Sequence, residues 1–71
     1  MSTAATPQPG QKYKAGPHRT VVVEHVARAE VYYAIHDDDS SSFFPDRYRV
    51  PIQTWVDYVA ASIAAGRIEA L

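Results

Sequence analysis

The run from Thr20 to Val26 (TVVVEHV) constrains the fold of this chain more than any other segment. β-Branched side chains fit an extended backbone better than a helix, so the run predicts a strand over residues 20–26. A second run, VYYAIH, predicts a strand over residues 31–36. The short connection between them favours a hairpin, although no Asn-Gly or Asp-Gly pair marks its turn.

Strict alternation along these runs predicts which side chains share a face. In the first run it places Val21, Val23 and His25 on one face and Val22, Glu24 and Val26 on the other, and in the second it puts Val31, Tyr33 and Ile35 together.

Two shorter segments, KYK and RYRV, also alternate polar with apolar residues. They predict short strands over residues 11–15 and 47–50. In the second of these we expect Tyr48 and Val50 to face the core.

The period of the apolar residues changes from two to helical spacing at Pro51. This predicts a helix over residues 52–65 that packs on the sheet. Its predicted apolar stripe consists of Ile52, Trp55, Val56, Val59, Ala60 and Ile63. Pro51 suits the first turn of the helix, but a capping box of Thr54 and Asp57 would move the start to Trp55. Gly66 predicts the end, and Ile68 and Leu71 either fold back on the core or stay loose.

The order of these elements predicts an α+β fold that is mainly β. We expect a small, strongly bent antiparallel sheet or an SH3-like barrel of four or five strands, with one C-terminal helix. Residues 1–10 contain two prolines and no aromatic side chain, which predicts a disordered tail. Residues 11–71 are expected to form a single small domain.

Composition excludes several classes of protein. The chain has no cysteine, so it holds neither a disulfide framework nor a thiolate site. Its formal net charge of -1 gives no global attraction to nucleic acid or to a membrane surface. No apolar run approaches the roughly 20 residues that span a bilayer, and no signal-peptide pattern is visible, so we expect a cytoplasmic protein.

The sequence also argues against catalysis and metal binding. The histidines His18, His25 and His36 are far apart and have no cysteine partner, unlike zinc ligands. Asp37, Asp39 and Ser41 match the start of a calcium loop, but Ser42 and Tyr48 replace its diagnostic glycine and glutamate. No nucleophile motif or phosphate-binding glycine loop is present. We therefore expect no enzyme activity, no cofactor, no metal and no small-molecule substrate.

Basic residues interleaved with aromatics are more suggestive of function. Lys12-Tyr13-Lys14 and Arg47-Tyr48-Arg49 have a pattern that can bind phosphates and stack on bases, although a strand with a charged solvent face gives the same pattern. Phe43 and Phe44 form either an exposed anchor for a partner or a cover over the core. The predicted partner-binding residues are Lys12, Tyr13, Lys14, Arg19, Phe43, Phe44, Arg47 and Arg49.

The segments PGQKYK, RTVVVEHVAR, VYY and RYRVPIQTWVDYV, between Pro9 and Val59, resemble small bacterial and phage domains of unknown function. The resemblance implies an SH3-like or KOW-type barrel without catalytic residues. Barrels of this class occur in transcription and translation factors, where they contact RNA polymerase, ribosomes or RNA. In size and class the chain also resembles small phage regulators that bind RNA polymerase.

These observations lead to one principal expectation and two alternatives. The first is a non-enzymatic interaction protein, phage or prophage encoded, that binds a host machine, with RNA polymerase as the best candidate. Its basic N-terminal region would order on the partner. The alternatives are a small RNA or single-stranded nucleic-acid-binding module, and an inhibitor of a host nuclease or defence complex that uses residues 37–39 as a phosphate mimic.

Overall fold

A computed structural model describes residues 7–39 and 45–71 of the chain. Its described residues form four strands and one helix in the predicted order and a fifth, unpredicted strand after the helix, which makes the fold α+β and mainly β. The elements are β1 (Lys12–Ala15), β2 (Arg19–Ala27), β3 (Glu30–Asp37), β4 (Asp46–Pro51), α1 (Ile52–Ala64) and β5 (Ile68–Ala70). The expected strands and helix are therefore confirmed. Most of their observed boundaries differ from the predicted ones by one residue.

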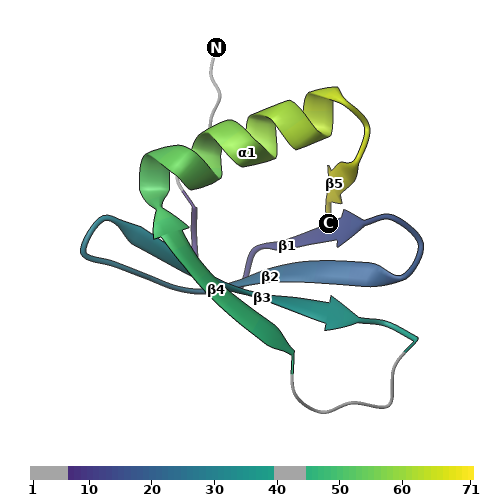
Figure 1. Ribbon diagram of the computed structural model, residues 1–71, viewed down its shortest axis with the longest axis horizontal. Helices are drawn as coiled ribbons and strands as arrows, with labels where there is room; N and C mark the ends of the chain where they lie inside the picture. Colours follow the sequence, from purple (N-terminus) through teal and green to yellow (C-terminus); the bar gives the residue numbers. More distant parts are fainter. Residues whose placement is uncertain (1–6, 40–44) are drawn as a thin grey trace.

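The strands form one antiparallel sheet in the order β4-β3-β2-β1-β5, and α1 lies across one face of it (Figure 1). Strands β4 and β5 are the two edges and do not pair with each other in the described part of the chain. This arrangement corresponds to the bent sheet of the two expected forms, and an SH3-like barrel stays a prediction. The described helix is not long and apolar enough to cross a bilayer.

The hairpin between β2 and β3 closes through Arg28 and Ala29. Both residues have a positive φ, 53° and 62° respectively. Two central residues of this kind are typical of a type I′ turn, whose twist matches that of the strands it joins. The hairpin thus forms without the Asn-Gly or Asp-Gly pair that usually supplies this backbone shape.

The helix begins directly after Pro51, which is its N-cap residue. No side chain caps this end, so the capping box of Thr54 and Asp57 is wrong. Asp57 instead accepts a hydrogen bond from the side-chain amide of Gln53, at 3.0 Å. Because Pro51 ends β4 and has no N–H to satisfy, strand and helix join without a loop.

The helix ends at Ala64, and Gly66 terminates it as predicted. Gly66 has a φ of 73°, and its N–H donates to the carbonyl of Ile63 while the N–H of Arg67 donates to the carbonyl of Ser62. These two bonds make a Schellman motif, which reverses the chain at little cost because glycine has no Cβ. The reversal folds Ile68 back into the core, where it is 6% exposed, whereas Leu71 remains 72% exposed.

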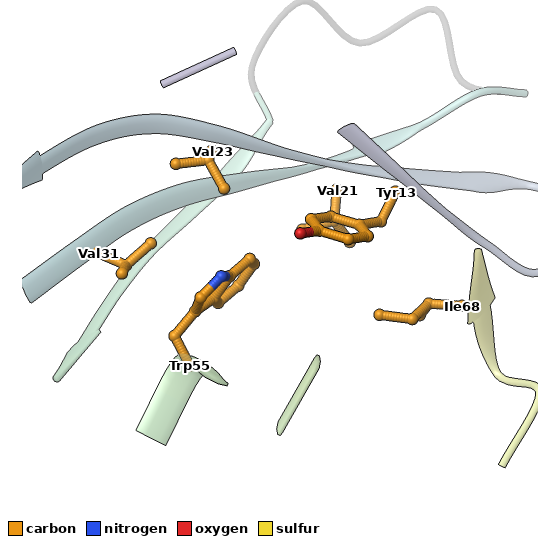
Figure 2. Packing of buried hydrophobic residues seen from close by; sticks show 6 residues of the cluster. All are labelled: Tyr13, Val21, Val23, Val31, Trp55 and Ile68. Atoms are coloured by element: carbon orange, nitrogen blue, oxygen red, sulfur yellow. The ribbon is translucent and has the colours of Figure 1, made fainter. Parts of the chain in front are cut away.

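The core lies between α1 and the sheet and is built around Trp55 (Figure 2). The Trp55 side chain is 3% exposed and meets Tyr13 edge to face, with ring centroids 6.1 Å apart. Tyr33 packs on the same indole at 4.7 Å. The other buried members of the cluster are Val21, Val23, Val31 and Ile68.

The buried stripe of α1 differs from its predicted composition at the C-terminal end. Ser62 is 1% exposed, whereas Ile63 is 46% exposed and Ala60 is also exposed. Ser62 lies where the helix contacts β5, so its small side chain lets this strand approach. Periodicity could not reveal this because β5 had no clear signal in the sequence.

A β-bulge in β2 corrects the predicted faces of this strand. The register shifts between Val23 and His25, so Glu24 is the extra residue. After the bulge Val26 packs against the core and His25 is exposed on the opposite face. Strict alternation had assigned these two residues the other way round.

Two further expectations are corrected at the margins of the sheet. Tyr48 lies on the predicted side of the sheet but is 47% exposed, because it belongs to the edge strand and only one side of its ring is covered, by stacking on Tyr33 at 5.4 Å. Residues 7–10 of the predicted tail belong to the fold: Pro7 is buried and the N–H of Gly10 donates to the carbonyl of Val23. Residues 1–6 lie outside the described residues.

Candidate interaction surface

The face of the sheet that points away from α1 has no described element packed on it. We call it the outer face. Strand register assigns its side chains, because directly paired residues of antiparallel strands point to the same side. The outer face carries Lys12, Lys14, Thr20, Val22, Glu24, His25, Glu30, Tyr32, Ala34, His36, Arg47, Arg49 and Glu69.

The register arranges the basic side chains on this face. Lys12 and Arg47 lie at opposite ends of one row, which runs through Val22 and Ala34. With strands about 4.8 Å apart, the two backbones are separated by roughly 14 Å. Arg49 ends a neighbouring row that contains Tyr32 and His25. The basic groups therefore lie in two places on the outer face, the lysines on β1 and the arginines on β4, rather than in one cluster.

Two of the four basic residues form ion pairs within the fold. Arg47 Nε lies 3.1 Å from Glu24 Oε1, so the bulged residue of β2 reaches the edge strand. Lys14 pairs with Asp38. Lys12 and Arg49 have no ion pair with any described residue, so no described side chain neutralises their charges.

The acidic loop after β3 is bound to the strands beside it. The Asp38 carboxylate accepts hydrogen bonds from Lys14 and from the Thr20 hydroxyl, at 2.9 Å for the latter. These hydrogen bonds, the one from Lys14 above all, lower the pKa of Asp38 below its ordinary value. Asp37 accepts the N–H of Asp39, and Asp39 also pairs with His18. The aspartates thus have local structural roles.

Among the described residues, Tyr32 is the one Phe, Tyr or Trp on the outer face. Its ring lies 5.6 Å from that of His25, at an interplanar angle of 47°. Its hydroxyl donates to Glu30 at 3.5 Å. The sequence did not single out this group as a site, because only the bulge brings His25 to the side of Tyr32. An aromatic pair beside Arg49 is a surface on which a planar group can stack.

The structure separates the eight predicted contact residues. Lys12, Lys14, Arg47 and Arg49 share the outer face. Tyr13 belongs to the core at 8% exposure, where burial raises its pKa, so its ring is not available to a partner. Phe43 and Phe44 lie outside the described residues.

Arg19 lies on the other side of the sheet from the four basic residues that share the outer face. It lines a shallow hollow of about 450 Å³ at the C-terminal end of α1. Tyr58, Ser62 and Arg67 contribute to the same hollow. A single partner surface that contacts Arg19 together with Lys12 would have to reach around β1.

Strand β4 has backbone groups at the edge of this surface that pair with no described residue. The N–H of Ile52 donates to the carbonyl of Ala29, at 2.9 Å. This bond makes Glu30 and Pro51 a non-hydrogen-bonded pair, so Val50 and Tyr48 direct their N–H and C=O groups to β3. Arg47 and Arg49 consequently direct theirs away from the sheet. The signal in the sequence was Pro51 itself, since proline suits an outward position of an edge strand.

The described residues contain no group of three or more His, Asp or Glu side chains that could hold a metal ion. No family model, curated protein or solved structure matches the chain.

Proposed function

We propose that this protein is a non-enzymatic interaction domain that binds a macromolecular partner through the outer face of its sheet. The observation that carries this proposal is the outer face itself, on which no described element packs and which carries Lys12, Lys14, Arg47 and Arg49. An exposed sheet face of this kind needs no pocket and no catalytic group to work. It acts by occupying or remodelling the surface to which it docks.

The balance of charge on the outer face favours a protein partner over a phosphate backbone. Glu24, Glu30 and Glu69 lie among the four basic residues. Two of the basic residues, Lys14 and Arg47, already form ion pairs within the fold. Phosphate backbones are bound by surfaces with a clear positive excess. At a protein interface, a mixture of positive and negative groups selects the partner and fixes how it is aligned.

The proposed partner is a component of the bacterial transcription apparatus, with RNA polymerase as the first candidate. This part of the proposal rests on the resemblance of the sequence to SH3-like and KOW-type domains and to small phage regulators. It places the protein in the cytoplasm and makes the host polymerase the machine whose activity it changes.

A binding titration of purified bacterial RNA polymerase with the fluorescently labelled protein tests the proposal. Lys12→Glu combined with Arg49→Glu should weaken binding by at least about tenfold, because both unpaired charges are reversed. Arg67→Glu, on the other side of the sheet, is the matched control and should change little. Equal affinity for all three proteins would show that the outer face is not the contact, and no binding by the unaltered protein would exclude the polymerase.

A single-stranded RNA-binding module is the second candidate, supported by Tyr32 and His25 beside Arg49. Base stacking on an aromatic side chain is worth about 1–3 kcal/mol. This candidate predicts that the protein binds an unstructured RNA oligonucleotide with an affinity that falls steeply with salt, and that Tyr32→Ala weakens it. A polarisation titration without binding at low salt would exclude this role.

A further inference from the structure

We infer that the free edge of β4 binds an extended acidic segment of a partner protein, which adds to the sheet as a sixth strand. The inference deepens the proposed interaction role, on which it rests, by naming the chemistry of the bound segment. It is carried by three features of β4: backbone groups that pair with no described residue, two exposed arginines, and a half-exposed tyrosine.

The outward backbone groups of β4 can pair with an added strand. Arg47 and Arg49 direct one N–H and one C=O each away from the sheet, as their register with β3 requires. These groups sit at alternate positions, about 6.6 Å apart along the strand. An added strand would form two pairs of hydrogen bonds with them, which is how sheets accept extended peptides.

The side chains of β4 specify the charge of that segment. The Arg47 and Arg49 side chains lie on the outer face, and a bound strand would place every second residue opposite or between them. Opposite charges across paired strands stabilise the pairing, and like charges weaken it. Acidic residues at alternate positions of the segment therefore fit these two arginines.

The other face of the strand specifies the intervening residues. Tyr48 is 47% exposed and Val50 is half-buried, and both lie on the side of α1. Aromatic and β-branched pairs are favourable across strands. The segment that fits β4 thus alternates acidic with apolar residues.

The same arginines disfavour a second copy of this chain as the occupant. Antiparallel pairing of two β4 strands about Tyr48 would place Arg47 directly opposite Arg49 of the other molecule, twice. Pairing about Arg49 would place the two Arg49 residues opposite each other. Charged residues and proline on an edge are also how sheets avoid self-association.

Glu24 moderates the charge of this edge. Its carboxylate is 3.1 Å from Arg47 Nε, so it competes with an acidic residue of the bound segment. The side chain of Arg47 nevertheless remains 66% exposed. Glu24→Gln should accordingly strengthen binding of an acidic strand about threefold, because it removes one negative charge beside the edge.

A blocked peptide that alternates glutamate with valine is the probe, and backbone amide exchange followed by NMR is the decisive measurement. The Arg47 and Arg49 amides should exchange fast in the free protein and become protected when the peptide binds. The control peptide has the same composition with its glutamates and valines in separate blocks, and it should protect neither amide.

Substitution of Arg49 separates backbone pairing from charge. Arg49→Ala removes the charge and keeps the N–H, so it should weaken peptide binding about fivefold. Arg49→Pro also removes the outward N–H, and should weaken binding by about a further fivefold to tenfold. Since this N–H has no partner in the sheet, circular dichroism should show that both variants are folded; should Arg49→Pro not fold, amide protection in the unaltered protein decides.

The outcomes distinguish this inference from the proposed function. Peptide binding without protection of the Arg47 and Arg49 amides, or no binding, would overturn strand addition and leave the polymerase titration unaffected. Protection of both amides by the peptide, together with no binding to polymerase, would keep the edge site and exclude that partner. A concentration-dependent dimer that protects these amides without peptide would show that the edge serves self-association instead.

Discussion

Asp38 accepts hydrogen bonds from Lys14 of β1 and Thr20 of β2, at the point where β3 has just ended. One carboxylate therefore connects three neighbouring strands at one end of the sheet. A run of three aspartates in a sequence is normally a solvated loop, and Asp38 differs only because the register brings Lys14 and Thr20 beside it. The hydrogen bond from Lys14 lowers the pKa of the Asp38 carboxyl.

The lowered pKa of Asp38 predicts a dependence of stability on pH. A carboxyl whose pKa is lower in the folded than in the unfolded state stabilises the fold above its unfolded pKa, which is about 3.9 for aspartate. That stabilisation is lost as the pH falls through the lower, folded pKa. Urea denaturation gives the free energy of unfolding at pH 7 and at pH 3. Its decrease between these two pH values should be smaller for Asp38→Asn than for the unaltered protein. Asp46→Asn is the control, since no ion pair of Asp46 with a described residue exists.

At the scale of elements, β2 and β3 depend on a turn whose backbone shape its residues do not favour. Arg28 and Ala29 both adopt a positive φ, which costs a residue with a Cβ about 1–2 kcal/mol relative to the right-handed region. The hairpin forms because the paired strands provide the longest ladder in the sheet. The strain is local and its removal is testable.

Ala29→Gly should stabilise the protein by about 0.5–1 kcal/mol, because glycine adopts a positive φ without the Cβ clash, although it loses more freedom on folding. Ala61→Gly, at an exposed position inside α1, is the matched control and should destabilise it by about 1 kcal/mol. Denaturant midpoints of the two variants give the comparison. A loss of stability for both would show that the turn is not strained.

At the scale of the whole molecule, one core on one side of the sheet holds the fold together, and no described element packs on the other side. Trp55 projects from α1 into the space between Tyr13, Tyr33 and the valines of β2 and β3. The indole is thus the point at which helix and sheet meet. A domain of this size has only about 3–5 kcal/mol of net stability to lose.

Trp55→Ala should cost about 3–5 kcal/mol, which is enough to unfold the domain. Circular dichroism and the loss of a cooperative melting transition would reveal this. Tyr58→Ala, one turn further along α1 and 51% exposed, should leave a cooperative transition in place. A folded, cooperative Trp55→Ala protein would mean that the core is held elsewhere.

The sequence by itself determined the order of the first four strands and the helix, the change from strand to helix at Pro51 and the stop at Gly66. Each of these depends on local chemistry: β-branched runs, helical spacing of apolar residues, the missing N–H of proline and the missing Cβ of glycine. It also singled out Lys12, Lys14, Arg47 and Arg49 as basic residues that alternate with aromatic ones, because alternation within a single strand is a local pattern.

Only the tertiary structure decided which of these residues share a surface. The bulge at Glu24 moved His25 beside Tyr32, and packing on Trp55 buried Tyr13. The pairing of β5 with β1 placed Ile68 over the core, and strand order made β4 an edge whose outward backbone groups pair with no described residue. These outcomes depend on register between segments far apart in the chain. A shift of one residue moves a side chain to the other face of a sheet, and no local pattern in the sequence fixes it.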